Sequence, residues 1–114
     1  MSGAPRISVD ELSLTLAALA DPTRRSILEQ LSLGPRTVTE LAAPYDMSQP
    51  AISKHLKVLE EARLITRDAG NRLGPRRLAL SPFTKAAAWM DAYARIWAAR
   101  INSFPEHRTP GKKQ

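Results

Sequence analysis

The sequence contains no cysteine, which removes the residue on which several kinds of protein chemistry depend. Disulfide bonds, thiolate catalysis and cysteine-based metal sites are therefore excluded. Histidine occurs only twice, at His55 and His107, and aromatic residues make up 5% of the chain. Two imidazoles so far apart in sequence do not indicate a metal site, and no cofactor is expected.

Long apolar runs are also missing. No segment approaches the roughly 20 consecutive apolar residues that span a bilayer, and the opening MSGAPRISVDEL has no run typical of a signal peptide. The chain has neither a glycine-rich phosphate loop nor a cluster of acids with a histidine, so we do not expect an enzyme. We expect a soluble intracellular protein with no membrane partner.

The charge of the chain is mainly of one sign. Lysine and arginine number 17 against 11 acidic residues, so the formal net charge is +6. A length of 114 residues with 43% hydrophobic residues is typical of one domain with one core. Such a basic domain often has a polyanionic partner, with nucleic acid the first hypothesis and an anionic membrane surface the second.

Apolar periodicity and capping residues predict four helices in the first half of the chain. Ser48, Asp21 and the Thr37/Glu40 capping-box pair are the predicted start signals. Arg24 and Arg25 are expected on the solvent side of the second helix. The predicted segments are residues 9–19, a helix from Pro22 that is stopped by Gly34-Pro35, a short helix from Val38 and a helix over about 49–62.

After residue 62 the apolar period changes to two, as in β-strands. Two short strands around the loop GNRLGP predict a β-hairpin, and Ser81 with Pro82 is expected to cap a last, long helix. Four helices, a hairpin and a helix form the winged helix-turn-helix arrangement, a mainly α (α+β) fold. We expect a flexible arm over 1–8, the domain over 9–104 and a disordered tail over 105–114.

The fourth predicted helix has one apolar and one polar side. Ile52, Leu56 and Leu59 fall together and are expected in the core. Side chains opposite them could contact base edges or phosphates in a major groove. An ordinary amphipathic helix with a solvated charged side is the alternative, and His55 at its edge is expected to be a packing residue or a phosphate contact. The DNA-contact candidates are Ser48, Gln49, Ser53, Lys54 and Lys57.

Arginines are concentrated in the predicted hairpin. Arg72, at its tip, could reach a minor groove, and Arg76 and Arg77 could flank it on phosphates. Arg67 on the first strand belongs to the same basic surface. The alternative is a hairpin whose charges are only solvated.

The first and last helices carry more apolar surface than a small winged domain can cover. We expect them to pack across a two-fold axis in a homodimer, which suits a pseudo-palindromic site. The alternative is that the last helix caps the core of its own chain. The dimerisation candidates are Leu12, Leu16, Trp89, Met90, Tyr93, Trp97 and Ile101.

Two stretches and the hairpin after them carry a family resemblance: LAALADPTRRSILEQL and TVTELAAPYDMSQPAISKHLKVLEEARLI. Over about residues 9–104 the chain resembles the ArsR (ArsR/SmtB) family of bacterial winged-helix repressors. Its ending AAAWMDAYARIWAARI resembles the metal-independent, SdpR-like branch. The resemblance implies a dimer of the first and last helices, a wing formed by the hairpin arginines, and DNA contacts by Ser48, Gln49, Ser53, Lys54 and Lys57.

The chain departs from the metal-sensing members of that family. Cysteines of those members follow the EL pair of the third helix, whereas Ala42, Ala43 and Pro44 follow it here. Asp91 lies on the last helix without the histidine that other members use. Sensing of metal or arsenite by those sites is excluded by chemistry. The hairpin loop is also longer than usual, and Leu78 stands where an aromatic residue is common.

These observations predict a dimeric, sequence-specific transcriptional regulator, a repressor of a pseudo-palindromic operator in double-stranded DNA. It would be located in the bacterial cytoplasm, at the nucleoid. Repression of its own operon and control by an unknown small-molecule effector are open points. The alternative function is a protein-interaction module whose basic helix and hairpin dock an acidic partner.

Overall fold

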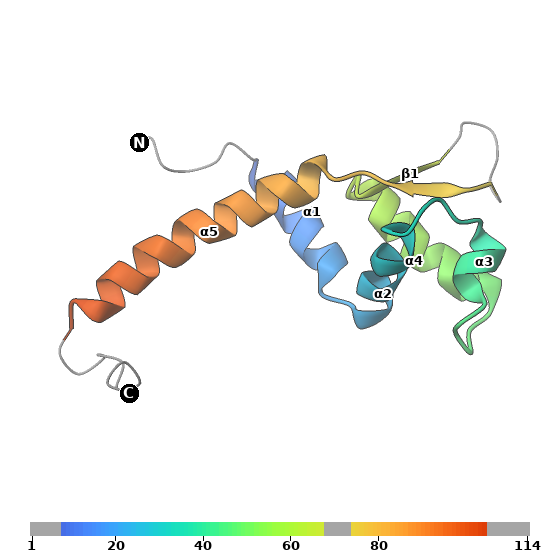
Figure 1. Ribbon diagram of the computed structural model, residues 1–114, viewed down its shortest axis with the longest axis horizontal. Coiled ribbons are helices and arrows are strands. Elements are labelled where there is room, and N and C mark those ends of the chain that lie inside the picture. Colours follow the sequence, from blue (N-terminus) through green and yellow to red (C-terminus); the bar gives the residue numbers. More distant parts are fainter. Residues whose placement is uncertain (1–7, 68–73, 105–114) are drawn as a thin grey trace.

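The computed structural model describes residues 8–67 and 74–104. Four helices, an antiparallel hairpin and a long helix follow one another (Figure 1). This confirms the predicted winged helix-turn-helix. Nearly all of the predicted arm and the whole predicted tail lie outside the described residues, so the domain boundaries stay predictions. The elements are α1 (Val9–Leu19), α2 (Pro22–Leu31), α3 (Val38–Ala42), α4 (Gln49–Glu61), β1 (Ile65–Arg67), β2 (Arg76–Leu78) and α5 (Ser81–Asn102).

Side-chain caps fix the starts of the first four helices. The Ser48 hydroxyl accepts from the backbone N–H of Ala51 at 3.2 Å, at the start of α4. Thr37 and Glu40 form the predicted capping box of α3, in which each side chain accepts from the other residue's backbone N–H. Each cap satisfies backbone donors that have no partner inside the helix, which is why these residue types mark helix starts.

The core lies between α2, α3, α4 and the start of the hairpin. Ile52, Leu56 and Leu59 of α4 are fully buried, as predicted from their spacing. They pack with Ile27 of α2 and Leu41 of α3. Burying one such side chain contributes about 1.5–3 kcal/mol, so this apolar side holds α4 on the body and leaves its polar side outward.

The hairpin is tied to the rest of the body at its base. Ile65 pairs with Leu78 and Arg67 with Arg76 in the antiparallel register. A further β-bridge joins the backbones of Arg36 and Arg76 through two hydrogen bonds of 3.1 and 2.7 Å. The segment that leads into α3 is therefore bonded to the second strand, so α3, α4 and the strands share one framework.

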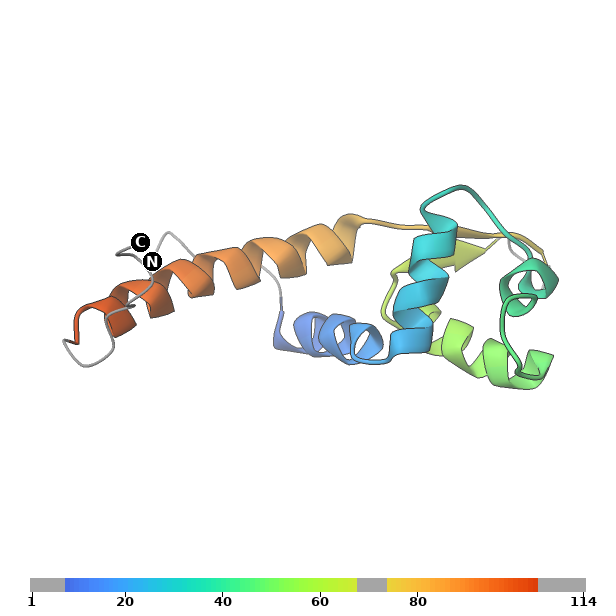
Figure 2. The ribbon, with the colours of Figure 1, turned by 60° about the horizontal axis from the view of Figure 1, so that its bottom comes forward.

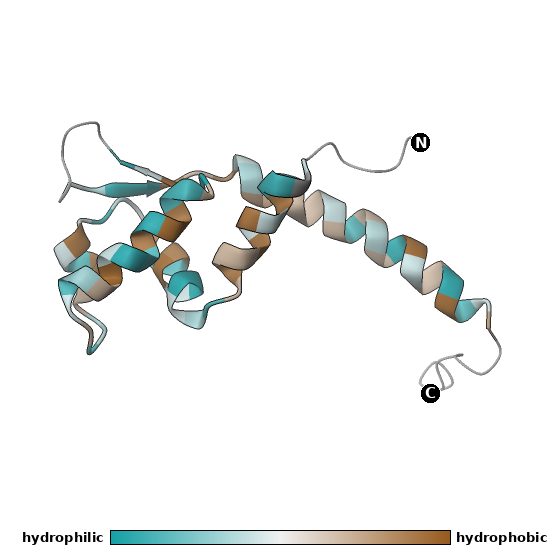
Figure 3. Cartoon of the chain, turned by 180° about the vertical axis from the view of Figure 1, so that it is seen from behind, coloured by the Kyte–Doolittle hydropathy of each residue, from teal (hydrophilic) through white to brown (hydrophobic). Residues whose placement is uncertain are grey.

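Helix α5 projects away from this body (Figures 1 and 2). Ala86 is its one buried residue among those described, and its start packs near α1. The Cα radius of gyration is 18.3 Å, whereas a compact domain of this length has about 13 Å. Hydrophobic residues occur along the projecting part (Figure 3), and large ones such as Trp97 and Ile101 are about half exposed among the described residues.

Two local predictions were wrong. Ser81 is the first residue of α5 rather than its cap, because Leu80 holds the N-cap position and no side chain accepts a hydrogen bond there. Arg24 is partly buried, so its predicted place on the solvent side was wrong, whereas Arg25 is exposed as predicted. Arg24 donates to the carbonyls of Ala17 and Ala18, and Arg25 donates to that of Leu19. These carbonyls end α1, where a cation is favoured.

Arg63 adopts a left-handed backbone conformation, with φ of 61°, just after α4. Its N–H donates to Glu60 and the N–H of Leu64 donates to Leu59, which closes the helix end. A side chain in this conformation costs about 1–2 kcal/mol, a cost that glycine avoids. Glycine also gives the unfolded chain more freedom, which offsets part of this gain. Arg63→Gly should therefore raise the free energy of unfolding by a smaller amount, about 0.5–1 kcal/mol. Urea denaturation measures this, and Arg63→Ala, which keeps the Cβ, should show no such gain.

Candidate nucleic-acid interface

The first turns of α4 present a continuous polar side. Gln49, Ser53, Lys54 and Lys57 are all exposed, and Ser48 at the cap is exposed beside them. Figure 1 shows α3 and the start of α4 at the end of the body that lies away from α5. The α4 candidates from the sequence are therefore all exposed: Lys54 and Lys57 lie opposite the buried Ile52, Leu56 and Leu59, and Gln49 and Ser53 lie to the side. Such a helix can enter a major groove with amide, hydroxyl and ammonium groups in front.

Gln49 is linked to the helix before it. Its Nε2 donates to the Thr39 hydroxyl of α3 at 3.1 Å, and both side chains are exposed. This bond restricts the amide while leaving its carbonyl oxygen and one N–H for a base edge. Thr39 is not among the DNA-contact residues predicted from the sequence. A hydroxyl on the short helix before the turn is the signal that could have drawn attention to it.

Tyr45, in the turn between α3 and α4, attaches this turn to α2. Its hydroxyl donates to Ser26 at 2.5 Å and accepts from Gln30 Nε2 at 3.2 Å, both on α2. The ring is half-buried against the core. The turn is thus attached to the body by packing and hydrogen bonds, so α4 has a fixed entry angle.

Arg76 was predicted to contact DNA phosphates, but the structure places its side chain elsewhere. Its side chain is buried, at 6% exposure, and its Nε donates to Glu60 Oε2 at 3.0 Å. Its Nη1 donates to the carbonyl of Gly74 at 2.8 Å. A guanidinium held in this way is turned toward α4 and not toward solvent. Arg76 is therefore removed from the set of proposed DNA contacts and assigned to the joint between hairpin and helix.

The other hairpin arginines are divided by the strand register. Arg67 pairs with Arg76, and its Nε lies 4.0 Å from Glu60 Oε1 with 40% of the side chain exposed. Arg77 pairs with Thr66, and both are exposed. Neighbouring strand residues alternate between the two faces. Arg77 therefore lies on the face away from Glu60, whereas Arg67 lies on the same face as Glu60. The predicted tip residue, Arg72, lies outside the described residues.

Glu60 is a residue of this region whose role is not predicted from the sequence. It follows buried Leu56 by four residues and so lies on the core side of α4. An acid at such a position requires a partner, since burying an unpaired charge is costly. That signal could have predicted an ion pair with a later basic residue, although not which one.

The junction of α1, α2 and α4 carries a small charged cluster. Arg24 Nη1 lies 3.4 Å from His55 Nδ1, and Asp21 Oδ2 lies 3.8 Å from the same nitrogen. His55 is half-buried, so it is a packing residue with polar partners, one of the two roles expected for it. Through the bonds of Arg24 to the carbonyls of Ala17 and Ala18, the cluster joins α4 to the end of α1.

Asp21 should contribute to acid sensitivity. The backbone N–H of Arg24 donates to its carboxylate and lowers its pKa below the usual 3.8, and the charges of His55 and Arg24 act in the same direction. A lowered pKa means that this contribution to stability is present above pH 3.8 and is lost as the pH falls through the folded-state pKa. Asp21→Asn keeps a capping side chain, so its free energy of unfolding should fall less steeply below pH 4 than that of the wild type. Thermal unfolding from pH 6 to pH 2 tests this, and parallel curves would contradict it.

Neither a candidate metal site nor a candidate membrane-spanning helix is found in residues 8–67 and 74–104. No three histidine, aspartate, glutamate or cysteine residues gather there in a way that could hold a metal ion. In the same ranges, no helix is long and apolar enough to cross a membrane.

A helix-turn-helix with a polar α4 side and an attached hairpin defines the winged-helix class of DNA-binding transcriptional regulators. The family model for "Bacterial regulatory protein, arsR family" matches residues 21–67. The HTH-type transcriptional regulator Rv2034 of Mycobacterium tuberculosis is 44% identical over 90 residues, which cover 78% of this chain and 80% of that protein. The chain belongs to the ArsR family of transcriptional regulators.

Two further comparisons agree with this assignment. A crystal structure of an ArsR family transcriptional regulator superposes with a TM-score of 0.74 at 38% identity, covering 81% of this chain and 95% of the other. The transcriptional repressor SdpR of Bacillus subtilis is 43% identical over 49 residues, which cover 43% of this chain and 54% of SdpR. Proteins of this family bind DNA and are not enzymes, and nothing in these comparisons supports the alternative of a protein-docking module.

Proposed function

We propose that the protein is a dimeric repressor that binds a pseudo-palindromic operator through α4 and the hairpin, without sensing metal. The observation that carries this proposal is the exposed polar side of α4, held on buried leucines and linked to α3 by the Gln49–Thr39 hydrogen bond. Repression rather than activation is supported by the relative SdpR of Bacillus subtilis, which is a transcriptional repressor. The bacterial cytoplasm, at the nucleoid, is the proposed location because chromosomal DNA is the proposed partner.

The proposed DNA contacts are assigned by their positions on the helix. The first turns, with Gln49 and Ser53, face base edges, and Lys57 lies farther along, where it can contact phosphate. Helix-flanking cations fix register and carry little sequence information. The proposed set is Ser48, Gln49, Ser53, Lys54, Lys57, Arg67, Arg77 and, outside the described residues, Arg72.

Dimerisation is proposed through α1 and α5. Met90, Trp97 and Ile101 of α5 are 52%, 51% and 49% exposed, which leaves large apolar side chains in water. Trp89, Tyr93 and Trp97 stack along the same helix with ring centroids 4.6 and 5.7 Å apart. An exposed apolar patch of this kind is typical of an interface, and Leu12 and Leu16 of α1 are proposed to complete it.

Independence from metal is proposed from the chemistry of the chain. It has no cysteine to bind arsenite or soft metals, and the SdpR-like ending of the sequence agrees with this. A regulator of this kind needs another trigger, and a small organic effector is the one we propose.

Substitutions at Gln49 and Lys57 test the DNA assignment. Gln49→Ala should weaken binding to an operator selected from genomic fragments by about 10-fold, and binding to random DNA much less, because one base contact is worth about 1–3 kcal/mol. Lys57→Ala should weaken both and lower the slope of log K against log salt by about 0.9. Fluorescence anisotropy at several salt concentrations measures both effects.

The control is Lys85→Ala, which removes the same charge from an exposed position on α5. It should leave the salt slope unchanged, since exposed charges more than about 10 Å apart are largely screened. Equal losses on operator and random DNA for Gln49→Ala would show that α4 does not contact bases in the proposed way.

A further inference from the structure

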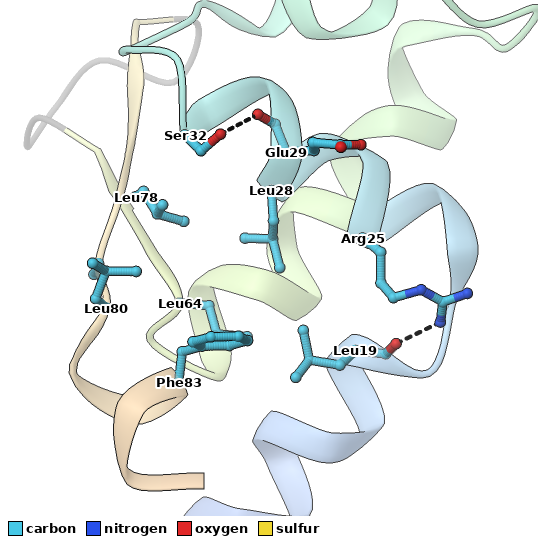
Figure 4. Close-up of a pocket in the computed structure, with 10 residues that line it drawn as sticks. Leu19, Arg25, Leu28, Glu29, Ser32, Leu64, Leu78, Leu80 and Phe83 are labelled. Atoms are coloured by element: carbon cyan, nitrogen blue, oxygen red, sulfur yellow. Dashed lines mark hydrogen bonds between the residues drawn. The ribbon is translucent and has the colours of Figure 1, made fainter. Parts of the chain in front are cut away.

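A cavity of about 480 Å³ lies where the end of α1, α2, the base of the hairpin and the start of α5 meet (Figure 4). Small-molecule sites are typically about 300–1,000 Å³ and mostly apolar. None of the described residues that line this cavity belongs to α4 or to the proposed DNA contacts. Its apolar wall consists mainly of Leu19, Leu28, Leu64, Leu78, Leu80 and Phe83.

The polar groups near the cavity are turned to other partners. Arg25 Nη1 donates to the carbonyl of Leu19 at 2.7 Å, and the Ser32 hydroxyl donates to the carbonyl of Glu29 at 2.6 Å. In Figure 4 the Glu29 carboxylate points away from Leu78 and Leu80. Arg25, Glu29 and Ser32 are the polar residues among the described ones that line the cavity, and the rest of the lining is hydrocarbon. A charged occupant would therefore lose most of its hydration in exchange for few polar partners.

The cavity is a recess with a closed floor and not a flat helix face. Leu64 at its floor is only 1% exposed. The N–H of Ala79 donates to the carbonyl of Leu64 at 2.8 Å and joins the two ends of the hairpin beneath the cavity. A recess lined by four elements, and partly open because Leu80 and Phe83 are 55% and 43% exposed, fits a molecule inserted into it, whereas the stripe on α5 is an extended surface of the kind that covers a second copy.

We propose that this cavity is the effector site of the protein and that it binds an uncharged, mainly hydrocarbon small molecule. The regulatory part of this proposal rests on the proposed function. Leu78 belongs to β2 and Phe83 to the first turn of α5, so an occupant contacts both the wing and the helix proposed to dimerise. A ligand that binds more tightly to one placement of these elements shifts the protein toward that placement.

Octan-1-ol and octanoate form a matched pair of probes for this site. Calorimetry on the full chain without DNA should show saturable binding of octan-1-ol, at one site per chain. Octanoate should bind about 10-fold more weakly or worse, because its carboxylate must be desolvated. Octan-1-ol should also change the affinity for the operator by about fivefold or more.

Two variants fill the cavity from different walls: Leu28→Trp from α2 and Ala79→Phe from the segment after β2. Each should abolish saturable octan-1-ol binding while circular dichroism confirms the fold. Leu33→Trp is the control, since Leu33 is highly exposed and does not line the cavity. It should bind octan-1-ol like the wild type.

Several results would overturn the proposal. They are an absence of saturable binding, binding that survives in a folded filling variant, and equal affinity for octan-1-ol and octanoate. Sedimentation gives the protein concentration at which the chain associates. If octan-1-ol binding were lost above that concentration, the proposal would also be overturned, because a second copy would then cover the cavity. The binding measurement contains no DNA, so a failure of the DNA-binding proposal would leave its result unchanged and the two failures can be told apart.

Discussion

Replacing Trp97 by glutamate is expected to convert the protein to monomers and to weaken operator binding by about 100-fold or more. Trp97 is 51% exposed in the single chain, so a charged side chain can be hydrated there without unfolding the domain. In the proposed dimer the same carboxylate would be buried in an apolar interface, which costs several kcal/mol. Two linked half-site contacts would then become independent ones, and the gain from joining them would be lost.

Sedimentation velocity and operator titration measure the two effects on the same samples. Ala99→Glu is the matched control, because Ala99 is exposed about 200° around α5 from Trp97, on the side of the exposed Asp91–Arg95 ion pair. It should remain dimeric and keep its affinity. A wild-type protein that sediments as a monomer at micromolar concentration would disprove the dimer.

Glu60→Gln is expected to lower the free energy of unfolding by about 2–3 kcal/mol. The substitution leaves the buried Arg76 guanidinium without the carboxylate that lies 3.0 Å from its Nε. Removing one member of a buried ion pair generally costs about 3–5 kcal/mol. The expected loss is smaller here because Glu60 is 25% exposed and glutamine can still accept a hydrogen bond.

Glu61→Gln provides the control at the next position, where the same charge is removed from an exposed side chain. It should change the free energy of unfolding by less than about 0.5 kcal/mol. Chemical denaturation gives both values. We also expect Glu60→Gln to weaken operator binding without contacting DNA, since it loosens the hairpin on α4. If the two variants had equal stability, the Glu60–Arg76 contact would contribute nothing to the joint.

Much of the fold could be predicted because its signals are local. The capping pairs at Thr37 and Ser48 mark helix starts by hydrogen bonds within three residues. The spacing of Ile52 and Leu56 fixes which side of α4 is buried, whatever it packs against. These features depend on neighbours in the chain, so the sequence alone is enough to find them.

The misplaced arginines each have a partner that is distant in sequence, although Arg24 also donates to the nearby carbonyls of Ala17 and Ala18. Arg76 is held by Glu60, 16 residues away, and Arg24 lies against His55, 31 residues away. A basic residue in a hairpin or at a helix start has the same local pattern whether it is solvated, ion-paired or on DNA. Only the tertiary arrangement decides among these roles.

The cluster of Asp21, Arg24 and His55 has a consequence for the length of the operator. Arg24 donates to the carbonyls of Ala17 and Ala18 at the end of α1 and lies 3.4 Å from His55 of α4, so we expect the separation of the two α4 helices in the proposed dimer to be fixed. One base pair inserted between half-sites turns one of them by about 35° around the duplex axis. Such a rigid pair of helices should bind one half-site spacing only and discriminate against operators that are one base pair longer or shorter.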